Sequence, residues 1–353
     1  MGGIPPINLA DDGAAPSPAE MAARLAALTA DGSVSTDYYG AGGPVTALEQ
    51  AFATLLGKER AVMFPTGTLA NRVAAQLMAA GRSGPRLIVH RDSHFFNDAG
   101  DNITAAGVTM VPLAGEGPSF TAAQVKAEMA RTASARVKAC LAGIAIESPS
   151  RRLANRLFDL EQRRDIVALA RAEGLPLYLD AARLFIEAAW TGQSPAGIAG
   201  PYDYVYVSLY KYLDAPFGSM LAGPAAALDE IFHERRRLGG GLYQMWPAAL
   251  LALDALPRQT HDWAKARSAG EAVLDTLAAV GLPVTRFADG SNTALVRLGE
   301  GHAGLAGLVE RGKATGLKVA PPSQDAVTLK INASWIREAP EALAVRIVTL
   351  LRG

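Results

Sequence analysis

The chain contains little cysteine and little histidine. Cys140 is its single cysteine, so no disulfide can form within the chain, which is typical of proteins from reducing compartments. The five histidines and that cysteine do not show the short spacings of metal ligands. We therefore expect no metal site and a cytoplasmic location.

An excess of charge and long apolar runs are also missing. Lysine plus arginine number 34, as do aspartate plus glutamate, so the formal net charge is zero. Without a basic excess, neither nucleic acid nor an anionic membrane is an expected partner. The longest apolar runs, such as "LAGIAI", are far shorter than a membrane span, and the first residues have no signal-peptide pattern. The sequence therefore predicts a soluble globular protein.

Half of the residues are hydrophobic, and they form strand-like runs separated by amphipathic helices. Seven such runs precede residue 224: "AVMF", "RLIVH", "VTMVPL", "ACLAGIAI", "PLYLD", "YVYVSLY" and "SMLAG". Strands that alternate with helices indicate an α/β fold with a mostly parallel sheet covered on both faces. Further along, the pattern changes to a smaller α+β unit. We predict an N-terminal arm outside the core (1–17), a large domain (18–255) and a small domain (256–353).

Ligands of parallel α/β sheets bind at the carboxyl ends of strands, so polar residues there are candidates for function. Gly67 and Thr68 follow the first strand and begin a helix, whose free backbone N–H groups can bind a phosphate. Lys211 follows an apolar strand that contains Ser208. An apolar environment would lower the pKa of the lysine amine, so that the neutral amine can attack a carbonyl.

Each of these residues also has an ordinary structural interpretation. A lysine after a strand is usually solvated, and a threonine before a helix is often only an N-cap. His94 and Asp180, which follow two further strands, are also explained by packing or by pairing with a buried charge. Taken together, these groups match the needs of pyridoxal 5'-phosphate. Lys211 would hold the aldehyde as an imine, Asp180 would pair with the ring nitrogen, and His94 would stack on the ring.

With these residues in place, the chain resembles the threonine aldolase family, within the β-eliminating lyases and the fold type I pyridoxal-phosphate enzymes. The resemblance runs from about Tyr38 to Trp246. Five segments carry it in order: "YYGAGGPVTALEQAFATLLGKERAVMFPTGTLAN", "HFFNDAG", "LPLYLDAARLF", "VSLYKYLDAPFGSMLAG" and "RRRLGGGLYQ". The resemblance implies an aspartate aminotransferase-like large domain with a seven-stranded sheet and a homodimer or homotetramer with sites at the subunit interface.

The resemblance also implies roles for individual residues. Lys211 forms the imine, Asp180 contacts the ring nitrogen and His94 stacks on the ring. Further cofactor and substrate contacts are expected from Gly67 and Thr68 at the phosphate, from Ser208 near the cofactor, and from Arg183 at the cofactor and the substrate carboxylate.

Four positions depart from the family pattern, and all of them concern the substrate. The N-terminal Ser-Asp-Thr of the family is replaced in "LADDGAA", so Asp11 stands where the serine would contact the substrate carboxylate and would repel it. Ser150 replaces a histidine that faces the substrate hydroxyl, and Tyr243 replaces an arginine. The small-domain arginine is missing, and Lys330 is the only cation in "QDAVTLKINAS". We predict that the cofactor machinery is kept and the substrate pocket is altered.

The leading functional hypothesis is a lyase that cleaves a β-hydroxy-α-amino acid to glycine and an aldehyde. His94, or a water that it holds, is the candidate for proton transfer. One alternative is another pyridoxal-phosphate reaction on an amino acid, such as β-elimination or racemisation. A second is a non-catalytic paralogue, which the joint presence of Lys211, Asp180 and His94 disfavours.

The basic run "SRRLANR" follows Pro149 and leaves two interpretations open. Arg151, Arg152 or Arg156 would receive a bulky or acidic side chain of the substrate, or all three are solvated loop residues. If Asp11 and Ser150 face the substrate, threonine is predicted to be a poor substrate.

Overall fold

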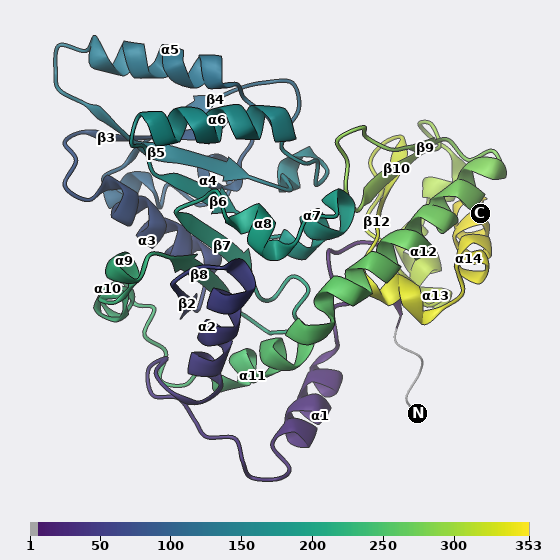
Figure 1. The fold of residues 1–353 in the computed structure, drawn as a ribbon. Coiled ribbons are helices and arrows are strands. Elements are labelled where there is room, and N and C mark those ends of the chain that lie inside the picture. The colour runs from purple at the N-terminus through teal and green to yellow at the C-terminus, as the bar shows by residue number, and fades with distance from the viewer. Residues whose placement is uncertain (1–5, 353) are drawn as a thin grey trace.

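The computed structural model of the chain describes residues 6–352. Its centre is a seven-stranded sheet in which β8 is antiparallel to its two neighbours and every other pair is parallel (Figure 1). The strand order is β2-β8-β7-β6-β5-β3-β4, with bounds β2 (Arg60–Phe64), β3 (Pro85–His90), β4 (Thr109–Leu113), β5 (Cys140–Glu147), β6 (Leu177–Asp180), β7 (Tyr204–Ser208) and β8 (Ser219–Gly223). The predicted seven-stranded, mostly parallel sheet is confirmed.

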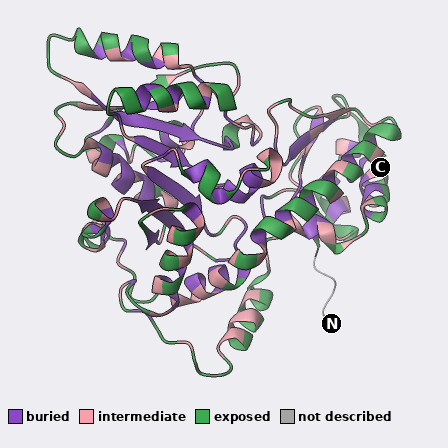
Figure 2. Cartoon of the chain, viewed as in Figure 1, coloured by how far each residue is buried: buried purple, intermediate pink, exposed green. Residues whose placement is uncertain are grey.

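Helices cover both faces of this sheet, because alternate strand residues point to opposite faces. In β7, for example, Val205 and Val207 belong to one buried cluster, whereas Tyr204 and Tyr206 belong to another. Figure 2 shows the sheet as the buried layer between helices with exposed outer sides. The first face carries α2 (Gly43–Leu56), α5 (Ala122–Ala133), α6 (Leu160–Ala172), α7 (Leu184–Thr191), α8 (Pro195–Ala199) and α11 (Trp246–Ala255), and the second carries α3 (Gly67–Ala79), α4 (His94–Asn97), α9 (Ala225–Leu228) and α10 (Ile231–Arg237).

The C-terminal part forms a smaller unit with its own hydrophobic cluster. Its sheet is antiparallel, in the order β12-β10-β9. The elements are α12 (Gln259–Ala279), β9 (Val284–Thr285), β10 (Thr293–Arg297), α13 (Leu308–Ala314), β11 (Leu317–Lys318), β12 (Ala326–Lys330) and α14 (Pro340–Arg352).

The N-terminal segment packs against this C-terminal unit. Strand β1 (Ile7–Asn8) pairs in parallel with β11, and Ile7 and Leu9 are buried in the C-terminal cluster. The side-chain amide of Asn332 donates to the carbonyl oxygen of Asn8 at 2.8 Å. The expectation of an arm outside any core was therefore wrong for this stretch, because its two apolar side chains complete the small core. The domain limits at residues 17 and 255 stay predictions, and helix α1 (Pro18–Leu28) follows with no buried residue.

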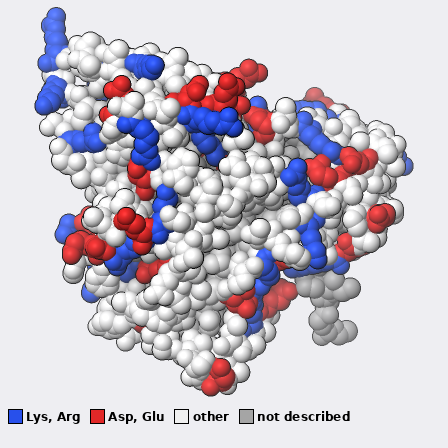
Figure 3. Space-filling model, viewed as in Figure 1, with Lys and Arg blue, Asp and Glu red and all other residues white. Residues whose placement is uncertain are grey.

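Lysine, arginine, aspartate and glutamate side chains are interspersed over the face of the molecule in Figure 3. Between residues 6 and 352, no helix is both long and apolar enough to cross a membrane. The same residues contain no group of three or more histidine, cysteine, aspartate or glutamate side chains that is placed to bind a metal ion.

Candidate active site

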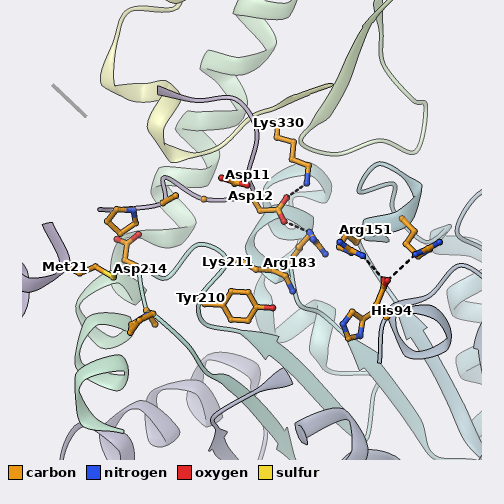
Figure 4. Close-up of a pocket in the computed structure, with 17 residues that line it drawn as sticks. Asp11, Asp12, Met21, His94, Arg151, Arg183, Tyr210, Lys211, Asp214 and Lys330 are labelled. Carbon is orange, nitrogen blue, oxygen red and sulfur yellow. Dashed lines mark hydrogen bonds and ion pairs between the residues drawn. The ribbon is translucent and has the colours of Figure 1, made fainter. Parts of the chain in front are cut away.

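A cavity of about 1020 Å³ lies at the carboxyl ends of the sheet strands, where the N-terminal segment and the end of β12 also meet (Figure 4). A smaller cavity adjoins it deeper in the sheet, and His94, Arg151, Arg183 and Lys211 line both. The inner cavity is also lined by Glu147, Asp180, Ala182 and Tyr206. The chain therefore brings the predicted Lys211, Asp180, His94 and Arg183 together in one site.

Lys211 enters the cavity from the loop after β7. Its side chain is half-buried, and loss of hydration together with the positive charge of Arg183 lowers the pKa of the amine to about 8. Gly13, in the N-terminal segment, packs against the backbone of Lys211. A Cβ atom at position 13 would overlap the Lys211 carbonyl oxygen. Only glycine permits this close approach. The backbone at Lys211 is therefore closely packed, and the lowered pKa increases the neutral fraction of the amine near neutral pH.

Asp180 is the last residue of β6 and is buried. The backbone N–H of Ala182 donates to its Oδ1 at 3.1 Å, and within residues 6–352 Oδ2 has no hydrogen-bond partner. Burial raises the pKa of this carboxyl, although the charge of Lys211 opposes that effect. A buried carboxyl with one unused oxygen is suited to pair with a cationic group of a ligand.

His94 begins α4, directly after the N-cap residue Ser93. The hydroxyl of Tyr178 donates to Oδ1 of Asn71, so the Asn71 amide nitrogen faces Nδ1 of His94, 3.5 Å away. This contact orients the imidazole ring at the cavity. Burial lowers the pKa of His94, although the charge of Glu147 opposes that effect, so the neutral ring is favoured at pH 7.

Sequence reasoning missed Glu147, although it ends an apolar strand, as Asp180 does. Its buried carboxylate accepts the backbone N–H of His94 at 2.6 Å and that of Arg151 at 2.9 Å. Burial and the negative charge of Asp180 raise the pKa of Glu147. Glu147 therefore holds together the loops after β3 and β5, which position His94 and Arg151 at the cavity.

Asp12 was also missed, and it is the buried carboxylate of the N-terminal segment. It accepts hydrogen bonds from Nε of Arg183 at 2.8 Å, from Nζ of Lys330 at 3.2 Å and from the amide of Asn155 at 2.9 Å. Burial acts to raise the pKa of Asp12, but the charges of Arg183 and Lys330 hold it well below its usual range. Asp12 thus joins the end of the large sheet to β12, and no local signal in the sequence marks that pairing.

Asp11 lines the large cavity. Lys318 offsets the repulsion that we expected between Asp11 and the substrate carboxylate. Nζ of Lys318 lies 2.6 Å from the Asp11 carboxylate, whose side chain is 50% exposed. Both hydration and the lysine charge weaken its effect on a bound anion. Asp11 is therefore a partly neutralised group at the rim, and its contact with substrate stays a prediction.

The N-terminus of α3 lies beside the inner cavity. A Cβ atom at Gly67 would overlap the hydroxyl of Tyr206, which lines that cavity. Thr66 is the N-cap, and its side chain accepts the N–H of Leu69 at 3.2 Å. Thr68 is exposed at the start of the helix, and neither Gly67 nor Thr68 lines the two cavities. Their phosphate contact stays a prediction that this position permits.

Three predicted residues, Ser150, Ser208 and Tyr243, do not line either cavity. Ser150 and Ser208 are buried, and within the described part of the chain their hydroxyl oxygens have no hydrogen-bond partner. Tyr243 is 60% exposed and packs edge-on against Tyr38 and Tyr39, away from the cavity lining. Substrate contact by Ser150 and cofactor contact by Ser208 remain predictions.

Comparison with known proteins identifies the family. The family model for beta-eliminating lyases matches residues 8–298. The chain belongs to the beta-eliminating lyase family. This confirms the family that its motifs resemble.

Two relatives illustrate the similarity within this family. The Caenorhabditis elegans protein R102.4 is 32% identical over 247 residues, which are 67% of this chain and 58% of that protein. Low-specificity L-threonine aldolase 1 of Arabidopsis thaliana is 27% identical over 230 residues, or 64% of either chain. Each alignment thus spans less than two thirds of the relative's own length.

The fold matches solved structures over nearly the whole chain. A Listeria monocytogenes protein described as an L-allo-threonine aldolase superposes with a TM-score of 0.82 at 23% identity, covering 99% of this chain and 96% of that one. At this identity the likeness establishes the fold alone. The fold is that of the fold type I pyridoxal-phosphate enzymes, as the family resemblance implied.

The residues of this beta-eliminating lyase fit pyridoxal phosphate. Lys211 supplies an amine of lowered pKa, and Asp180 supplies a buried carboxylate with one unused oxygen. The α3 N-terminus, where Gly67 leaves no room for a side chain, can receive a phosphate.

Proposed function

We propose that this protein is a pyridoxal-phosphate-dependent lyase that cleaves a β-hydroxy-α-amino acid to glycine and an aldehyde. One observation carries the proposal: Lys211, with its lowered pKa, shares a cavity with Asp180 and His94. The family and the printed activity of the Arabidopsis relative, a low-specificity L-threonine aldolase, support this reaction class.

Four groups would hold the cofactor. Lys211 would bind its aldehyde carbon through Nζ, Asp180 would pair with the ring nitrogen, and Gly67 and Thr68 would receive the phosphate. His94 lies at the start of α4, where its ring can lie against that of the cofactor. When bound, the cofactor would accept the electron pair released at Cα.

Arg183 is the proposed anchor of the substrate's α-carboxylate. Its Nε is used by Asp12, and within residues 6–352 its two Nη groups make no hydrogen bond. Because the guanidinium is planar, these groups can bind a carboxylate while Nε stays paired. Lys330 stands on the other side of Asp12 and adds positive charge to the same wall of the cavity.

Proton transfer would involve His94 and Lys211. The neutral ring of His94, or a water that it holds, would accept the proton that the substrate's β-hydroxyl loses. Lys211 would give a proton from Nζ to Cα. Its pKa of about 8 places it close to the working pH that proton transfer requires.

The test is to load the purified protein with pyridoxal phosphate, reduce it with borohydride and locate the adduct by mass spectrometry. We expect the adduct on Lys211, and glycine release from at least one of threonine, allo-threonine and phenylserine. The Lys211→Ala protein should fold, form no such adduct and release no glycine. A keto acid in place of glycine would indicate β-elimination, the mirror-image amino acid would indicate racemisation, and no turnover would indicate a non-catalytic paralogue.

We further propose that the active unit is a homodimer or homotetramer. Tyr38 and Tyr243 are 63% and 60% exposed, and with Tyr39 they form an aromatic cluster of the kind that is enriched at protein interfaces. Sedimentation of the wild type beside a Tyr38→Ser variant would test this, and a monomeric wild type would contradict it. The cytoplasmic location remains a prediction from composition.

A further inference from the structure

Two arginines share one carboxylate at the mouth of the cavity. Nη2 of Arg151 lies 2.8 Å from one oxygen of Asp98, and Nη1 of Arg152 lies 3.2 Å from the other. The arginine side chains are 47% and 43% exposed, and all three residues line the large cavity beside His94 (Figure 4). This Asp98 cluster contains two positive charges and one negative charge, so it has one positive charge in excess.

A second cluster of charged side chains that lines the same cavity has the same net charge. Arg183 and Lys330 share the single carboxylate of Asp12, so this Asp12 cluster also carries one excess positive charge. It contains the arginine proposed above to bind the α-carboxylate.

The other acidic residues of the cavity have their own partners. Asp11 is paired with Lys318, and Asp214 is paired with Arg24 and Arg258, none of which lines the cavity. Glu147 and Asp180 of the inner cavity have raised pKa values and face Lys211 as well as Arg183, so both clusters keep positive charge for a ligand.

We propose that the preferred substrate carries a second carboxylate on its β-carbon side. This rests on the proposed lyase function: the α-carboxylate binds at the Asp12 cluster, and the distal carboxylate binds at the Asp98 cluster. A dicarboxylic β-hydroxy-α-amino acid matches the two excess charges of the cavity, whereas threonine leaves one of them without a partner. The free N–H groups of Arg151 and Arg152 can receive the distal carboxylate through charge-assisted hydrogen bonds.

The reaction balances without a further reactant. In 3-hydroxyaspartate the Cα–Cβ bond breaks, and the β-hydroxyl loses its proton as its carbon becomes a carbonyl. The electron pair of the broken bond stays with Cα, which takes up one proton. The products are glycine and glyoxylate, and 3-hydroxyglutamate would give glycine and the next longer aldehyde acid.

The test compares kcat/KM for threonine, 3-hydroxyaspartate and 3-hydroxyglutamate, each with both configurations at the β-carbon. We expect the wild type to favour at least one dicarboxylic substrate over threonine by about tenfold or more, the order of effect of one charge-assisted hydrogen bond. Arg152→Gln should lower kcat/KM for that substrate by about tenfold and change threonine by less than about twofold. Arg152 is chosen because Arg151 also lines the inner cavity and binds Glu147 through its backbone.

Two further variants serve as controls. Arg152→Lys keeps the charge and should retain most of the preference. Arg297 is 52% exposed and paired with Asp325 outside the cavity lining, so Arg297→Gln should leave the rates on all substrates unchanged. Circular dichroism and melting curves would establish that each variant is folded.

The results separate the two proposals. Glycine release from threonine with no preference for either dicarboxylic acid, or equal effects of Arg152→Gln on all substrates, would overturn the inference and leave the lyase function standing. No glycine from any substrate would overturn the lyase function and the inference with it.

Discussion

The Lys211 amine illustrates how single side chains set the chemistry of the site. A solvated lysine has a pKa near 10.4, so at pH 7 well under one part in a thousand is neutral. At Lys211, burial and the charge of Arg183 lower the pKa to about 8, which raises the neutral fraction to roughly a tenth at pH 7. The nearby Asp180 acts in the opposite direction, so the lowered value shows that loss of hydration dominates.

This pKa predicts a distinct pH profile for the lysine. Trace acetylation of the cofactor-free protein with acetic anhydride, read at the Lys211 peptide by mass spectrometry, should reach half its maximal rate near pH 8, because only the neutral amine reacts. Arg183→Gln removes the positive neighbour and should shift the midpoint upward. A Lys211 profile that rises only above about pH 10 would show that the amine is solvated.

Single residues at the site differ in how far they could be predicted. Lys211, Asp180 and His94 follow apolar strands within a few residues, so local sequence indicates their place at the edge of the sheet. Asp12 is different, because its partner Arg183 is 171 positions away and only the folded chain brings the two together. Its neighbour Asp11 has the same charge, and nothing in the sequence tells which of the two is buried.

At the scale of elements, the start of α3 is held against β7. Gly67 is the first residue of the helix, and the Tyr206 hydroxyl occupies the space that a side chain at position 67 would need. Tyr206 is itself buried within β7. This contact keeps the free N–H groups of the helix end at a fixed position beside the inner cavity. Because the neighbour lies in the central sheet, neither partner can move away without disturbing a packed layer.

Gly67→Ala should therefore weaken cofactor binding as well as destabilise the fold. The added methyl group overlaps the Tyr206 hydroxyl, and overpacking of this kind costs about 1–3 kcal/mol of unfolding free energy. We expect the dissociation constant of pyridoxal phosphate to rise by about tenfold or more, measured by absorbance titration beside urea unfolding. The double variant Gly67→Ala/Tyr206→Phe, which removes the hydroxyl, should recover part of both losses, and an undiminished affinity in Gly67→Ala would contradict the proposed phosphate site.

Long apolar elements were predictable, and short ones were not. The seven strands of the large sheet and helices α3, α5 and α6 have periodic apolar patterns that indicate their type. Strands β1 and β11 have two residues each, and they pair only because residues 7–8 lie against residues 317–318 in the folded protein. Such pairing depends on tertiary contacts and has no pattern of its own in the sequence.

At the scale of the whole molecule, the N-terminal segment connects the two parts of the chain. Asp12 accepts hydrogen bonds from Arg183, which follows β6 in the large sheet, and from Lys330, which ends β12 in the small one. The Asp12 and Arg183 side chains are buried, so this ion pair is shielded from water and salt. The Asp12 carboxylate is therefore one of the contacts that fix the relative position of the two parts.

Replacing that carboxylate should destabilise the protein strongly. Asp12→Ala leaves Arg183 buried without its partner, at a cost of about 3–5 kcal/mol in unfolding free energy. Asp11→Ala is the matched control, because its half-exposed pair with Lys318 contributes about 1 kcal/mol or less. Urea unfolding of both variants would measure the difference, and equal effects would show that the burial of Asp12 does not matter.

The difference in unfolding free energy between the wild type and Asp12→Ala also depends on pH. The folded pKa of Asp12 lies below the ordinary value near 3.9, so its stabilising effect is complete above that pH and is lost as the pH falls toward the folded value. The stability gap between wild type and Asp12→Ala should therefore narrow below about pH 4.

The pairing of the N-terminal segment also sets an order in which the protein can be completed during translation. The backbone N–H of Asn8 donates to the Ser334 hydroxyl, a residue 326 positions later, and Asn332 and Lys330 bind the same segment. Residues 8–12 can therefore make these contacts only after residues 330–334 have been synthesised. A nascent chain that has been synthesised past β8 contains every strand of the large sheet, together with Asp180 and Lys211. Asp12 of that chain still lacks its partner Lys330. The wall that is proposed to receive the substrate's carboxylate is thus completed only after Lys330 has been synthesised.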